Sequence, residues 1–99
     1  MEIKDLKINK PYIGAFPDGY DLFIPKIIKH EFAIGVYIRT GDSPNIEFQH
    51  KLEKGKAGRF RTPEDVEEII EYVIDGFPKD KLKIIDKEDL FNLLFAWKS

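Results

Sequence analysis

The sequence contains no cysteine, and this absence excludes disulfide bonds, thiolate metal ligands and cysteine nucleophiles together. No apolar run approaches the roughly 18 residues that a membrane-spanning helix needs, and the charged first residues lack the apolar core of a signal peptide. A small domain that folds without disulfide bonds is typical of a reducing compartment. We therefore expect a cytoplasmic protein without a membrane partner.

Motifs that would identify an enzyme or a metalloprotein are also missing. The chain has no glycine-rich phosphate-binding pattern and no serine or threonine in a nucleophile elbow. Its two histidines, His30 and His50, do not form a metal-ligand spacing; we interpret His50 as a partly buried structural residue and His30 as exposed. The sequence thus predicts no catalytic residue, no metal site and no cofactor. An enzyme would require a pocket that unites Asp18, Asp21 and His30.

The length of 99 residues, with 42% apolar and 34% charged residues, predicts one folded domain that spans residues 1–99. A net charge of -2 provides no overall attraction to nucleic acid. The charges are nevertheless grouped. Residues 51–61 contain five basic side chains and one acidic side chain, whereas residues 64–75 contain six acidic side chains and no basic one.

Alternating apolar side chains predict a central strand over residues 32–40. One face would carry Phe32, Ile34, Val36 and Ile38, and the other Ala33, Gly35, Tyr37 and Arg39. We expect this strand to be half-buried, to have a partner on each edge and to be covered on its apolar face.

Turn-forming residues divide the remaining strands into hairpins. Pro17-Asp18-Gly19 predicts a turn between strands at 12–16 and 20–24, and residues 41–45 predict a turn between strands at 32–40 and 46–52. The last strand should carry four side chains on one face: Ile46, Phe48, His50 and Leu52. The first nine residues are interpreted as a short strand or an extended arm.

A helix is expected to begin at Thr62, with Thr62 as the cap, Pro63 in the first position and acidic residues in the first turn. Gly76 should end it in a left-handed conformation. A short strand at 82–85 and a second helix at 87–97 would follow. The predicted fold class is α+β in the order ββββαβα: a four- to five-stranded, mostly antiparallel meander sheet with two helices packed on one face.

The first functional hypothesis concerns the two predicted helices. The second helix is apolar over most of its circumference, which is more than a small domain readily buries, and the first helix carries a row of acidic side chains. These features predict a non-catalytic inhibitory or regulatory protein, such as a phage accessory protein, that binds a protein partner or a second copy of itself. The predicted contact residues are Phe91, Phe95, Trp97, Glu64, Glu68 and Glu71. The alternatives are that the aromatic side chains of the second helix are buried in the core of the domain and that the acidic face of the first helix only aids solubility.

The alternative functional hypothesis is a single-stranded nucleic-acid-binding domain. A basic, glycine-containing loop at 51–61 leads directly into a helix, and nearby aromatic rings offer stacking surfaces. The candidate nucleic-acid or phosphate-binding residues are Lys54, Lys56, Arg59, Arg61, Tyr37 and Arg39. The same loop is also compatible with a purely solubilising role.

Overall fold

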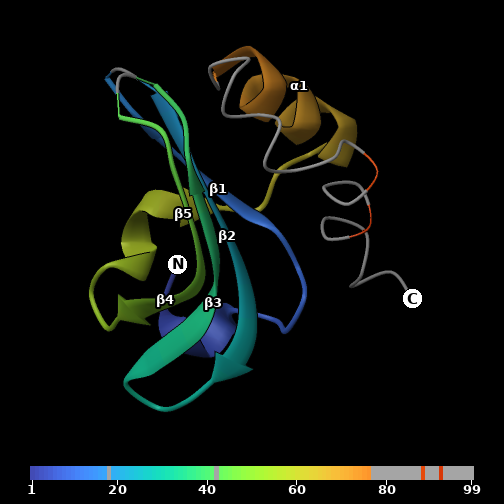
Figure 1. Ribbon diagram of the computed structural model, residues 1–99. Helices are drawn as coiled ribbons and strands as arrows, with labels where there is room; N and C mark the ends of the chain where they lie inside the picture. Colours follow the sequence, from blue (N-terminus) through green and yellow to red (C-terminus); the bar gives the residue numbers. More distant parts are fainter. Residues whose placement is uncertain (18, 42, 77–87, 89–91, 93–99) are drawn as a thin grey trace.

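The computed structural model describes residues 1–17, 19–41, 43–76, 88 and 92. Within these residues five antiparallel strands and one α-helix form an α+β fold (Figure 1). The strands are β1 (Tyr12–Phe16), β2 (Gly19–Ile28), β3 (Phe32–Arg39), β4 (Asn45–Glu53) and β5 (Phe60–Arg61), and the helix is α1 (Val66–Gly76). Two short 3-10 helices, η1 (Ile3–Asp5) and η2 (Ala57–Arg59), complete the elements.

The strands lie in the order β4-β3-β2-β1-β5. Both predicted hairpins are confirmed, because β1 pairs with β2 and β3 pairs with β4 in antiparallel register. The central strand β3 has a partner on each edge, as expected. Strand β5 was not predicted; it lies within the basic loop and pairs with the free edge of β1. The start of the chain forms η1 instead of a strand.

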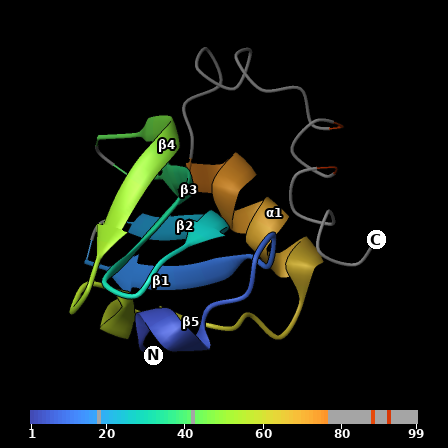
Figure 2. The same cartoon turned by 90° about the horizontal axis from the view of Figure 1, so that it is seen from below.

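The two faces of the sheet are both covered, so the fold has two apolar clusters. On one face, Ile69, Ile70 and Val73 of α1 pack against strand residues that include Leu22 and Val36. Figures 1 and 2 show α1 on this side of the sheet and η1 and η2 on the other. The second cluster therefore fills the face that was expected to be uncovered.

The expectation that β3 is half-buried is wrong. Ala33 is 0% exposed and Tyr37 is 6% exposed, although both belong to the face that was expected to be open. They pack in the second cluster against Ile3 of η1 and Ala57 of η2. The short segments around the sheet thus supply a cover that local alternation does not reveal.

Two bulges change which face a side chain occupies. In β2, Lys26 is an extra residue between the pairs Pro25↔Gly35 and Ile27↔Ile34, and in β4 the register shifts between His50 and Glu47. A bulge adds one residue to the two-residue period of a strand and so moves the following side chains to the opposite face.

The prediction that the apolar side chains of β4 share one face is wrong because of the β4 bulge. Ile46 packs against the cluster under α1, whereas Leu52 belongs to the second cluster. Phe48 lies at the irregularity and is 62% exposed. The alternation of apolar residues along this strand is therefore divided between two cores.

The ends of α1 differ from the prediction in their detail. Asp65, not Thr62, caps the helix, because the backbone N–H of Glu67 donates to Asp65 Oδ1 at 2.9 Å and the helix begins at Val66. Gly76 ends α1 without a left-handed conformation. A Cβ atom there would lie 2.6 Å from Cβ of Thr40, so close packing explains the glycine. No helix in the described part of the chain is long and apolar enough to cross a membrane.

The predicted strand at 82–85 and the second helix at 87–97 lie outside the described residues, which contain only two isolated positions of that region. Phe91, Phe95 and Trp97 are among the undescribed residues. The second helix and its place in the fold stay predictions.

Candidate functional site

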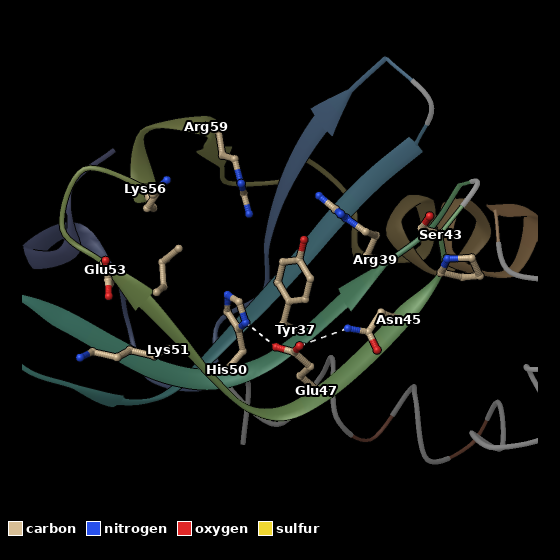
Figure 3. A pocket seen from close by; sticks show the side chains of 12 residues that line it. Tyr37, Arg39, Ser43, Asn45, Glu47, His50, Lys51, Glu53, Lys56 and Arg59 are labelled. Carbon is tan, nitrogen blue, oxygen red and sulfur yellow. Dashed lines mark hydrogen bonds and ion pairs between the residues drawn. The ribbon is translucent and has the colours of Figure 1, made fainter.

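A cavity of about 840 Å³ opens on the face of the sheet that lies opposite α1. Strands β3 and β4 form its floor and one wall, and the segment around η2 forms the facing wall (Figure 3). Its volume falls in the range of roughly 300 to 1,000 Å³ that is typical of small-ligand sites. Charged and aromatic side chains from segments that are distant in sequence line this cavity.

A buried ion-pair cluster lies at one side of the cavity. Asp21 of β2, whose side chain is 1% exposed, pairs with Nη2 of Arg59 at 2.7 Å and with Nε of Arg39 at 3.5 Å. Neither carboxylate oxygen has a well-aligned hydrogen bond among the described residues, so charge attraction holds the cluster. A buried carboxylate is costly without such compensation. The side chains of the two arginines are about 40% exposed and line the cavity.

Aromatic rings support both guanidiniums. The Arg39 guanidinium lies 4.9 Å from the ring centre of Phe16, and that of Arg59 lies 4.9 Å from the ring centre of Phe60. Cation–π contacts of this kind restrict the orientation of an arginine side chain. The Arg39–Arg59 pair is thus held in place before any ligand arrives.

Tyr37 lies beside this cluster, and its hydroxyl points between Arg39 and Arg59 (Figure 3). Burial, followed by the neighbouring Asp21 carboxylate, raises the pKa of the Tyr37 phenol to about 12. The phenol is therefore neutral at physiological pH and can serve as a hydrogen-bond donor.

His50 continues the aromatic surface of the cavity. Its ring stacks on Tyr37 with a centroid distance of 4.3 Å and an interplanar angle of 23°. Its Nδ1 hydrogen bonds to Oε2 of Glu47 at 2.5 Å, and Nδ2 of Asn45 donates to Oε1 of Glu47 at 3.2 Å (Figure 3). The hydrogen bond from His50 lowers the pKa of Glu47, which keeps this carboxyl charged.

The β4 bulge creates this Glu47–His50 pair. Residues three apart on a regular strand point to opposite faces, but the register shift between Tyr37↔Glu47 and Gly35↔His50 inserts one residue and lets both side chains reach the cavity. Gly35 lies directly opposite His50, and a Cβ atom there would clash with the backbone of Ile24 in β2, so the close approach of β2 explains this glycine. The bulge alone accounts for the position of the imidazole.

The structure brings together four of the six residues predicted to bind nucleic acid. Tyr37, Arg39, Lys56 and Arg59 line one cavity. Lys54 instead pairs with Glu31 at 3.7 Å and lines a different cavity of about 450 Å³ near the first residues of the chain.

The sixth residue, Arg61, is exposed on β5 and does not line the main cavity. The basic loop is therefore divided between two surfaces.

Three site residues were missed by sequence reasoning: Asp21, Glu47 and His50. An acidic residue inside the apolar segment 20–24 was a usable signal for Asp21, because a carboxylate within a strand of the core needs a cationic partner. No comparable signal marked Glu47 and His50, since their proximity depends on a bulge.

The predicted protein-contact residues are only partly described. Glu64 and Glu71 are exposed, while the side chain of Glu68 lies outside what the structure describes, as do all three aromatic residues of the predicted second helix. The structure therefore leaves this contact surface a prediction.

The described residues contain no group of three histidine or acidic side chains that would hold a metal ion. His30 is exposed, pairs with Glu31 at 3.2 Å and lines the smaller cavity instead of the main one. No family model matches the chain, and neither the curated proteins nor the solved structures include a match. The function is therefore argued from the chemistry of the cavity.

Proposed function

We propose that this protein is a non-catalytic binding protein whose cavity takes a segment of single-stranded nucleic acid. The observation that carries this proposal is the convergence of Tyr37, Arg39, Lys56 and Arg59 on one cavity. Sites for single strands combine cations that follow the backbone with aromatic rings on which bases stack. The cavity contains both elements.

The charge of the cavity supports an anionic ligand. Four cationic side chains line it: Arg39, Lys51, Lys56 and Arg59. They exceed the acidic residues at the site, which are Glu47, Glu53 and the buried Asp21. The local charge is thus opposite in sign to the net charge of -2 of the whole chain, and a local positive field attracts phosphates even where the protein as a whole does not.

The proposal is tested by fluorescence anisotropy with a labelled single strand of about 12 nucleotides, a length within the usual site size. The double variant K51A/K56A removes two exposed cations from the cavity rim. We expect it to weaken binding and to reduce the slope of log affinity against log salt by about 1.4, since each phosphate contact on a single strand contributes about 0.7.

The matched control is K54A/R61A, which removes two cations of the same loop that lie outside the cavity. It should bind the strand almost as tightly as the unchanged protein. Equal losses in the two variants would point to diffuse attraction by the loop, and no binding by the unchanged protein would refute the proposal.

Binding to a protein partner or to a second copy stays the other hypothesis from the sequence. Of its acidic residues, Glu64 precedes α1 and Glu71 lies on α1, and both are exposed to solvent. Sedimentation of the purified protein, with E64Q/E71Q as the comparison for a basic partner, addresses it independently of the cavity.

A further inference from the structure

The imidazole of His50 has one face covered by Tyr37 and a ring edge directed into the cavity. Tyr37 stacks on the covered face at 4.3 Å, while the ring also lines the cavity and keeps 27% of its side chain exposed. In Figure 3 the ring nitrogen that does not bind Glu47 points into the cavity. The ring is thus an aromatic surface at the floor of a cationic cavity.

This ring is fixed before a ligand binds. Glu47 holds Nδ1 at 2.5 Å, and Asn45 holds Glu47 at 3.2 Å. The buried ring of Phe23 approaches the imidazole edge-on at 6.2 Å. Fixing a contact surface in advance reduces the ordering cost that a ligand would otherwise meet on binding.

The Arg39–Arg59 pair provides a site for an anion beside this ring. A guanidinium has five N–H donors, and each of these two presents one nitrogen to Asp21. Most donors therefore remain for the oxygens of a ligand. Asp21 is 1% exposed, so it fixes the two arginines from below without facing the cavity itself.

We infer that the cavity holds one nucleotide unit, with its base packed against the exposed edge of His50 and its phosphate bound by the Arg39–Arg59 pair. Figure 3 shows the Arg59 side chain directed from the opposite wall toward the floor on which His50 lies. Tyr37 joins the two subsites, because its ring supports His50 and its hydroxyl lies between the arginines. This inference rests on the proposed function and adds a position for the base.

The test compares uridine 5′-monophosphate, uridine and inorganic phosphate by calorimetry and by NMR titration. The nucleotide should bind more tightly than either part, and it should shift the imidazole resonances of His50. His50→Ala should weaken nucleotide binding by roughly tenfold or more, because the loss of an aromatic contact to a base weakens affinity by about this factor. The same variant should leave the affinity for inorganic phosphate unchanged.

His50→Phe is the second variant, because it keeps an aromatic face and removes the hydrogen bond to Glu47. It should recover most of the affinity that His50→Ala loses, and dispersed NMR spectra verify that both variants fold. If inorganic phosphate and the nucleotide bind with equal affinity, the cavity is an anion site only. If His50→Ala and the unchanged protein bind the nucleotide with equal affinity, the base does not contact His50. Either result overturns the inference.

Binding of the 12-nucleotide strand separates this inference from the proposed function. If the strand binds and K51A/K56A weakens it, while His50→Ala has no effect on either probe, the base subsite is wrong and the proposed function stands. If neither the strand nor the mononucleotide binds, both are wrong. If only the strand binds, the inference of a site for one nucleotide unit is wrong and the proposed function stands.

Discussion

Asp21 is the residue that organises the charges of the cavity. It comes from the middle strand of the sheet, opposite Arg39 in the register, and it also reaches Arg59 from the far wall. One buried carboxylate thus connects three segments of the chain. The two arginines remain about 40% exposed, which makes the cluster both a structural support and a surface for ligands.

Replacing Asp21 with asparagine should therefore destabilise the protein. The change keeps the volume but removes the charge that compensates two guanidiniums; because these retain contact with water, we expect a loss of about 2 kcal/mol in the free energy of unfolding, below the 3 to 5 kcal/mol of fully buried pairs. Urea denaturation measures it. Glu71→Gln, at an exposed position on α1, is the control and should change stability by less than about 0.5 kcal/mol. A similar small change in both variants would contradict the structural role of Asp21.

Tyr37 makes a separate prediction about pH. Its pKa is about 12 in the folded protein against the ordinary value of 10.0, so the unfolded chain releases this proton first as pH rises. The contribution of Tyr37 is complete below pH 10 and is lost between pH 10 and about 12, by roughly 2 kcal/mol in total.

Urea denaturation across this alkaline range measures the loss, and Tyr37→Phe should show a shallower one. Burial also raises the pKa of Tyr12, so the variant keeps part of the effect. Identical alkaline profiles for the variant and the unchanged protein would show that Tyr37 is not the group responsible.

At the scale of the element, the bulge in β4 connects the core with the site. It divides the apolar residues of the strand between two clusters and places Glu47 and His50 at one cavity. Bulges often lie beside functional sites because they redirect side chains without ending the strand. The same irregularity leaves Phe48 largely exposed.

Two substitutions in β4 test this arrangement. Phe48→Thr should change the free energy of unfolding by less than about 0.5 kcal/mol, because the ring is 62% exposed. Leu52→Ala should cost about 2 to 5 kcal/mol, because Leu52 is 2% exposed within the second cluster. Chemical denaturation compares the two. Comparable losses would indicate that Phe48 and Leu52 are equally buried on one face of a regular strand, which would contradict the bulge.

At the scale of the whole molecule, the two faces of the sheet have different surroundings. One face packs against α1, and the other combines an apolar cluster with the cavity. Figure 1 shows α1, which carries the exposed Glu71, on one side of the sheet, whereas the cationic residues that line the cavity come from the other side. An anionic ligand can approach the cavity without facing the acidic surface of α1.

The cavity is built from distant segments and exists only in the folded protein, so a ligand that binds there should stabilise the entire fold. A single strand of about 12 nucleotides at 100 times its dissociation constant should add about 2.7 kcal/mol, which raises the melting temperature by roughly 10 °C or more for a domain of this size. Thermal denaturation at low salt measures the shift. K51A/K56A, at the same strand concentration, should show a smaller shift; an equal one would place the strand elsewhere.

The sequence by itself determined the strands at 12–16 and 32–39, their hairpins and the apolar face of α1, because each depends on local alternation, turn residues or helical spacing. It also identified most of the cations that reach the cavity. These features concern residues that are neighbours along the chain.

Only the tertiary structure decided how the faces are used. The register with β3 produces the β4 bulge that pairs Glu47 with His50, and the cover supplied by η1 and η2 buries Tyr37. Asp21 becomes a buried anchor only when strand β2 meets the loop that carries Arg59. Each outcome depends on contacts between distant segments, whose geometry local periodicity does not contain.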